Sequence, residues 1–264
     1  MKSKSFLRSF LLWLPFLVLY LLYKFLPFSV WIGNEYGFLA FKILFFVALD
    51  VPLLLYKKKN RALETPEVYE SAPYWTLLPL LICCFSNFLT VPILSLPFEK
   101  SVNAGILVLD ILSDYPVSLF EDVFFLEMGI AIWEMILPHR KGHRMLSGIL
   151  ASLIYMLCDA YSFHGYPWDY QVFQDAMVFL LAGLCAYLAL HYESLWLAVS
   201  FHFLFNVGNF ILFHAFVVEP QISPAYLTFS LVVTALTGCY AILHYRLETR
   251  LPRKRTEAEE GRDC

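Results

Sequence analysis

The chain has 264 residues, of which 59% are hydrophobic and 18% aromatic. An ordinary soluble domain has roughly 45–50% apolar residues. Only 16% of the residues are charged, the net charge is −3, and the mean hydropathy is +0.63. A water-soluble fold would leave much of this apolar surface exposed. The composition therefore favours a polytopic, all-α membrane protein and argues against a soluble enzyme or a nucleic-acid-binding protein.

Eight apolar stretches are long enough to cross a hydrocarbon core of about 30 Å as helices. In chain order they lie at 9–27, 37–56, 73–97, 119–137, 145–163, 171–191, 195–217 and 225–245. The segment 102–118 differs because it contains Asn103, Asp110, Asp114 and Pro116. We expect this segment to form a short interfacial or re-entrant helix that does not cross.

The basic residues predict an orientation. With eight crossings, sixteen of the nineteen lysines and arginines fall on one side, and Lys24, Lys42 and Lys100 are the exceptions. Cytoplasmic loops are enriched in basic residues, so both termini are predicted to be cytoplasmic. We expect an integral protein of the plasma membrane, with the lipid bilayer as its first partner. Bulky residues follow the first apolar run, so we expect it to be retained as a span rather than cleaved as a signal peptide.

The cysteines and the C-terminal tail suggest no chemistry on their own. Five cysteines lie in apolar stretches without a CxxC motif or metal-ligand spacing, and we expect packing thiols rather than disulfides. They are Cys83, Cys84, Cys158, Cys185 and Cys239. The tail 249–264 is charged, and its basic part is expected to contact anionic lipid.

Ionisable residues inside apolar spans are costly and therefore mark candidate functional sites. Glu121 and Asp122 begin the stretch at 119–137, where a helix would direct them about 100° apart. One can then face a cavity while the other pairs with a neighbouring helix. Asp159 lies near the end of the next span, and His202 and Asn206 are one turn apart in the span at 195–217.

These residues resemble the motifs of the CPBP family of intramembrane endopeptidases, which includes CAAX proteases and bacteriocin-processing enzymes. The family pattern is Glu-Glu-x-x-x-Arg, then Phe-x-x-x-His, then His-x-x-x-Asn, on helices of a four-helix core. The segment EDVFFL at 121–126 is similar to the first motif, YMLCD at 155–159 to the second, and HFLFN at 202–206 to the third. The resemblance covers roughly 119–217.

The resemblance implies that Glu121 activates a water molecule for attack on a peptide carbonyl. It also implies that His202 and Asn206 bind the water, the oxyanion or a metal, while Asp122 and Asp159 complete the catalytic set. The expected substrate is a peptide or a membrane-tethered protein. The domain organisation that follows is N-terminal helices at 1–101, a protease-like core at 102–217, and a last helix with a cytoplasmic tail at 218–264.

The chain departs from the family pattern at three positions, and at one of them Asp122 replaces the second glutamate. Leu126 stands where the family has arginine, and Asp159 stands where it has the second histidine. An alignment shifted to place His164 in that position would move the histidine beyond the helix. Three carboxylates without the arginine require either a protonated group or a cation. A divalent ion, Zn²⁺ or Mn²⁺, held by Glu121, Asp159 and His202 would meet that requirement.

Two other functions remain open from the sequence. A non-catalytic relative that binds and regulates other membrane proteins would tolerate the altered motifs. A small-solute transporter is less favoured, because no inverted repeat or pair of broken helices is recognisable.

Overall fold

The structure is a computed structural model that describes residues 2–60, 78–89, 91–92, 102–137, 143–160, 168–191, 195–215 and 224–250. All regular secondary structure in these ranges is helical, which confirms the all-α prediction for them. The N-terminal helices are α1 (Lys2–Phe25), α2 (Phe28–Ile32), α3 (Glu35–Asn60), α4 (Leu78–Cys84) and the 3₁₀ turn η3 (Ser86–Leu89). The remaining elements are α6 (Ala104–Glu121), the π-helical segment η4 (Asp122–Met128), α7 (Gly129–Ile136), α8 (His143–Ala160), α9 (Trp168–His191), α10 (Leu195–Ala215) and α11 (Pro224–Arg250).

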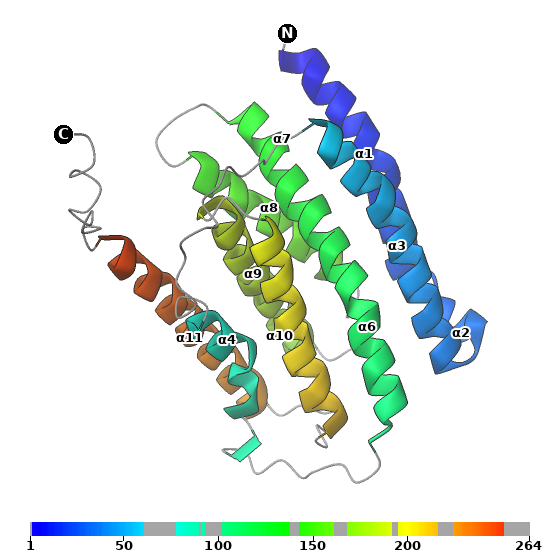
Figure 1. Ribbon diagram of the computed structural model, residues 1–264, viewed down its shortest axis with the longest axis vertical. Coiled ribbons are helices and arrows are strands. Elements are labelled where there is room, and N and C mark those ends of the chain that lie inside the picture. The colour runs from blue at the N-terminus through cyan, green and yellow to red at the C-terminus, as the bar shows by residue number, and fades with distance from the viewer. Residues whose placement is uncertain are drawn as a thin grey trace, which may run out of the picture.

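The helices form a bundle around α6, as Figure 1 shows. Helices α1 and α3 lie on one flank of the α6–η4–α7 rod, whereas α10 packs on the other side of α6, and α8 and α9 contact η4. Helices α4 and α11 cover the far side of α9 and α10. The start of α1, the end of α3, the end of α7 and the start of α8 point toward the same end of the bundle. Within the bundle, polar side chains of α6 bond to those of α8 and α10, as Glu121 does to Tyr155 and Asp114 to Asn206.

Among the described residues, the helices α3, α9 and α10 are long and apolar enough to cross a membrane. Their apolar windows are Glu35–Leu55, Tyr170–Leu190 and Leu195–Leu212. Large apolar side chains are also exposed on the outer faces, for example Leu44 at 71% and Leu236 at 64%. An apolar exterior of this extent is compatible with a lipid environment. The full count of eight spans and the domain boundaries stay predictions.

The segment 102–118 does not form a separate interfacial helix. Residues from Ala104 to Ile136 form one continuous helical rod of α6, η4 and α7. Asn103 caps the start of α6, because its side-chain oxygen accepts hydrogen bonds from the backbone N–H groups of Gly105 and Ile106 at 3.1 and 3.2 Å. The polar residues that suggested an interfacial helix are accommodated because Asp114 is buried and paired with α10.

The third predicted span, 73–97, is only partly described. Its described part consists of α4 with seven residues, the short turn η3, and residues 91–92. The chain therefore changes from α-helix to 3₁₀ helix inside the predicted span. The turn presents Asn87 to the interior, where its side chain donates to Asn209 Oδ1 at 2.8 Å and accepts from Ser230 at 2.7 Å. These bonds compensate for the break by joining η3 to α10 and α11.

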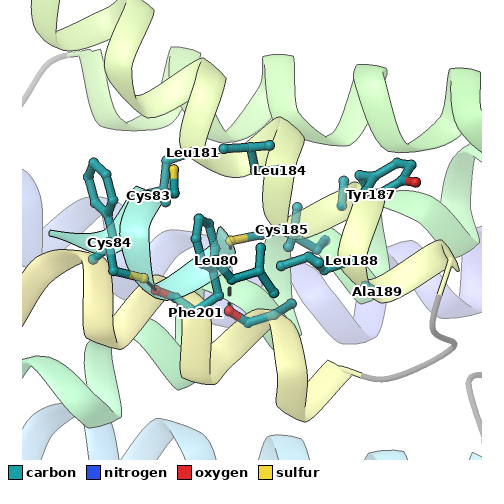
Figure 2. Close-up of a cluster of buried hydrophobic side chains, with 14 of the residues drawn as sticks. Leu80, Cys83, Cys84, Leu181, Leu184, Cys185, Tyr187, Leu188, Ala189 and Phe201 are labelled. Carbon is teal, nitrogen blue, oxygen red and sulfur yellow. Dashed lines mark hydrogen bonds between the residues drawn. The ribbon is translucent and has the colours of Figure 1, made fainter. Parts of the chain in front are cut away.

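Close helix contacts at two glycines set the spacing of the core. A Cβ on Gly129 of α7 would lie 2.8 Å from the Cβ of Ala151 on α8. A Cβ on Gly208 of α10 would lie 2.6 Å from the carbonyl oxygen of Cys84 on α4. Around the second contact, side chains of α4, α9 and α10 form the buried cluster in Figure 2. Cys83 and Cys84 of α4 and Cys185 of α9 are buried free thiols in this cluster. This confirms for these three cysteines the prediction that they serve in packing.

Candidate functional site

Glu121 lies at the end of α6, buried with 4% of its surface exposed. Two tyrosines hold its carboxylate. Tyr20 of α1 donates to Oε1 at 2.8 Å, and Tyr155 of α8 donates to Oε2 at 2.5 Å. Both rings are fixed by stacking, Tyr20 on Phe120 at 5.6 Å and Tyr155 on Phe125 at 4.9 Å between ring centroids. The carboxylate is therefore oriented by hydroxyl groups from helices on two sides.

A lysine from α1 supplies positive charge to this site. Lys24 Nζ lies 2.6 Å from Asp159 Oδ1 on α8 and 3.8 Å from Glu121 Oε1. Both carboxylates are largely shielded from solvent, and an unpaired buried carboxylate is strongly unfavourable. The sequence required a cation or a protonated group among these carboxylates. The structure places the ammonium group of Lys24 there.

His202 of α10 lies between the two adjacent acids of the first motif. Its Nδ1 is 3.3 Å from Asp122 Oδ1, and its Nε2 is 3.9 Å from Glu121 Oε2. All three side chains are buried. The Asp122 contact fixes the imidazole ring, so that its other nitrogen faces Glu121.

The π-helical segment η4 starts at Asp122, directly after Glu121. A π turn bonds residue i to i+5 and so displaces the side chains that follow relative to a regular α-helix. Such segments often occur at functional sites. Here the change in helix type falls between the two acids, so that Asp122 contacts α10 while Glu121 also reaches α1 and α8.

Four of the five predicted site residues line one cavity of about 470 Å³: Glu121, Asp159, His202 and Asn206. The fifth, Asp122, contacts the site through His202. The cavity is lined by α1, α3, η3, α6, α8, α9, α10 and α11, and it also includes Lys24 and Tyr155. Its volume falls in the range of roughly 300–1,000 Å³ that is common for ligand sites. The sequence motifs therefore converge on one internal space.

Asn206 also pairs with an acid of α6 that the sequence motifs do not include. Its side-chain amide donates to Asp114 Oδ2 at 3.1 Å, and Ser118 donates to the same oxygen at 3.0 Å. One end of the α6–α10 interface carries another pair, with His214 Nε2 3.1 Å from Asp110 Oδ2. The acids of α6 thus face polar partners on α10 along much of their contact.

Sequence reasoning did not assign Tyr20, Lys24 or Asp114 to the site. Tyr20 and Lys24 are four residues apart in the first apolar run, a spacing that puts both on one helix face. The same spacing relates Asp110, Asp114 and Ser118 to Asp122. These periodicities are visible in the sequence, but they do not reveal which helix each face meets.

The metal-ligand group that gathers among the described residues differs from the predicted set. Asp122, Cys185 and His202 each offer a ligand atom, and these atoms lie within 4.8 Å of one another. This buried group could hold a metal ion. The predicted ligand set was Glu121, Asp159 and His202, so the two sets share His202. In the structure, Asp159 of the predicted set instead forms an ion pair with Lys24.

His164, the alternative for the second histidine, lies outside the described residues, as do the basic loop residues 138–142 and the tail from residue 251.

Comparison of the chain with models of protein families, with curated proteins and with solved structures returns no match.

Proposed function

We propose that the protein is an intramembrane endopeptidase related to the CPBP family, in which Glu121 activates a water molecule for hydrolysis of a peptide bond. The observation that carries the proposal is the 3.9 Å separation between Glu121 Oε2 and His202 Nε2 beside the cavity. A separation of this size is too long for a direct hydrogen bond. A water molecule at about 2.8 Å from each atom bridges it with ordinary geometry.

The two atoms have complementary roles in this proposal. Glu121 removes a proton from the bridging water as its oxygen attacks the peptide carbonyl, and later passes that proton to the leaving amine. His202 Nε2 donates to the developing oxyanion, while Asp122 beside Nδ1 stabilises the charged ring. The peptide C–N bond breaks, and water supplies the hydroxyl of the acid product and a proton of the amine product.

Lys24 and Tyr155 support these roles through contacts with the carboxylate of Glu121. The ammonium of Lys24 is 3.8 Å from Glu121 Oε1 and provides the positive charge that the family's arginine would supply at Leu126. Tyr155 occupies the aromatic position of the second motif and holds Oε2 toward His202. The apolar part of the cavity lining, including Val117, Phe173 and Met177, suits an apolar peptide segment.

The membrane arrangement is part of the same proposal. The chain crosses the plasma membrane eight times, with both termini in the cytoplasm, and takes peptides or membrane-tethered proteins as substrates. The three apolar helices and the apolar exterior support a membrane location. The basic residues outside the spans support the orientation.

The test is cleavage of a defined peptide library by the full-length protein in phosphatidylcholine vesicles, with products identified by mass spectrometry. We expect cleavage by the wild type and a loss of at least about 100-fold in Glu121→Gln and His202→Gln. Asp50→Asn is the matched control, because it removes another buried carboxylate, on α3, and should retain activity. Equal cleavage by all variants, or no cleavage by any, would exclude the catalytic role.

A non-catalytic protein that binds other membrane proteins is the second candidate. The observation in its favour is the ion pair between Lys24 and Asp159, because it fills the position of the family's second histidine with a structural contact. This candidate predicts no cleavage by the wild type or by any variant. The cleavage assay therefore distinguishes the two functions.

A further inference from the structure

Three buried side chains from three elements meet where η4, α9 and α10 come together. Asp122 comes from η4, Cys185 from α9 and His202 from α10, and their ligand atoms lie within 4.8 Å of one another. We propose that Asp122, Cys185 and His202 bind a zinc-like divalent metal ion. This ion site does not depend on the proposed peptidase activity, because it can be measured without substrate.

The geometry of the acid and the imidazole already fits a shared ion. Zinc binds nitrogen and carboxylate oxygen at about 2.0–2.1 Å in a tetrahedral arrangement, which places two such ligand atoms roughly 3.3 Å apart. His202 Nδ1 and Asp122 Oδ1 are separated by 3.3 Å. An ion at this position would replace the proton that the two groups otherwise share. The thiol of Cys185 lies within 4.8 Å of the other two ligand atoms and would move closer to complete a three-ligand set.

An unsatisfied oxygen provides a second, independent indication. Asp122 is fully buried, and its Oδ2 has no hydrogen-bond partner among the described residues. Leaving a buried carboxylate oxygen unpaired is costly, and the ordinary hydrogen bond between Oδ1 and His202 does not relieve it. A bound cation compensates the charge of the whole carboxylate. The orphan oxygen is thus explained by an ion and not by the hydrogen bond.

The identity of the three ligands selects the kind of ion. A thiolate with an imidazole favours zinc-like ions over Mn²⁺ or Mg²⁺, which prefer oxygen ligands. Within the part of the chain that the structure describes, Cys185 Sγ makes one long contact, of 3.8 Å, to the carbonyl oxygen of Ala198. Figure 2 shows Cys185 among apolar side chains of α9, close to α10. Three protein ligands leave a fourth position open, as zinc sites with a catalytic role do.

Glu121 and the cavity both lie beside the proposed metal site. The carboxylate of Glu121 faces the metal-binding histidine, and the cavity offers the ion a route of entry. A metal-bound histidine usually directs its other nitrogen toward a carboxylate. His202 Nε2 faces Glu121 in this way, at 3.9 Å, a distance that a water molecule would bridge. Because His202 also lines the cavity, an ion can reach the site from the cavity side. Asp122 and the thiolate would balance the two positive charges of the ion.

The experiment is a titration of the tag-free, full-length protein in detergent with Co²⁺, which reports thiolate ligation through a charge-transfer band in the near ultraviolet. We expect the wild type to bind equimolar Co²⁺ with this band and Zn²⁺ to displace it. Cys185→Ser should abolish the band and weaken binding by about 10-fold or more. Cys83→Ser, which alters another buried thiol of the same cluster, should change neither.

A variant that keeps Cys185 as its sole cysteine distinguishes loss of the thiolate ligand from misfolding of Cys185→Ser. In a protein that keeps Cys185 and has alanine at the five other cysteines, the band should persist. Asp122→Asn and His202→Gln in that background should each weaken Co²⁺ binding by about 10-fold or more. Absence of the band in the wild type, or its presence in Cys185→Ser, would overturn the proposal. Loss of peptidase activity alone would leave these spectra unchanged.

Discussion

Lys24 of α1 and Asp159 of α8 form an ion pair with 2.6 Å between Nζ and Oδ1, although they are 135 residues apart in the chain. The pair joins the first helix to the core of the bundle. It also brings a positive charge to 3.8 Å from Glu121. A residue outside every recognised motif therefore determines the electrostatics of the motif residues.

Removing Lys24 should destabilise the protein. Lys24→Met leaves two carboxylates without their cation in a largely buried site, where loss of one partner costs about 3 kcal/mol. Asp159→Asn should cost less, because Lys24 still faces Glu121. Equilibrium unfolding in mixed micelles of both single variants and the double variant should give a coupling of about 1 kcal/mol or more.

Lys42→Met is the matched control for this comparison. Lys42 also lines the cavity, but its Nζ lies over the ring of Phe210 at 5.9 Å, an interaction worth about 1 kcal/mol. If Lys24→Met unfolds no more readily than Lys42→Met, the ion pair contributes nothing to stability.

The two tyrosines that hold Glu121 should each contribute to stability through their hydroxyl groups. Tyr20→Phe and Tyr155→Phe keep the stacked rings but remove a hydrogen bond to a carboxylate, at a cost of about 2 kcal/mol each. Tyr115→Phe, at an exposed residue of α6, should change the unfolding free energy by less than about 0.5 kcal/mol. Losses of equal size at all three positions would argue against a specific role in orienting Glu121.

The contact between α10 and α4 should tolerate no larger side chain at Gly208. Gly208→Ala would place a Cβ 2.6 Å from the carbonyl oxygen of Cys84, so the helices must separate, and we expect a loss of about 1–3 kcal/mol. Gly183→Ala in α9 should instead be neutral or stabilising by about 0.5 kcal/mol, because its Cβ would meet nothing within 4 Å. Thermal unfolding in detergent compares them, and a Gly208→Ala protein as stable as Gly183→Ala would contradict the close approach.

The predicted orientation can be tested with single cysteines in a cysteine-free protein in sealed vesicles or cells. A His164→Cys protein should react with an impermeant thiol reagent only from the non-cytoplasmic side. A Ser3→Cys protein should react only from the cytoplasmic side, because the basic N-terminal segment is expected there. Reaction of position 164 from the cytoplasm alone would reverse the proposed topology.

Much of the fold could be read from the sequence because long apolar runs leave the backbone few alternatives. Within the described residues, the runs at 9–27, 37–56, 145–163, 171–191, 195–217 and 225–245 fall in helices. The exception at 102–118 has a physical reason. Polar residues that indicate an interface in an isolated helix are also compatible with burial when another helix supplies hydrogen-bond partners, as Asn206 does for Asp114.

By itself, the sequence determined an apolar, helical chain, and this followed from hydropathy, a local property of the sequence. The resemblance of its motifs to one family grouped Glu121, Asp159, His202 and Asn206, and the structure brings these four residues to one cavity. Only the tertiary structure decided that Lys24 is the cation, that Tyr20 and Tyr155 orient Glu121, and that Asp122, Cys185 and His202 form the candidate metal group. The reason is that helix periodicity specifies which residues share a face, whereas packing between distant helices specifies which faces meet.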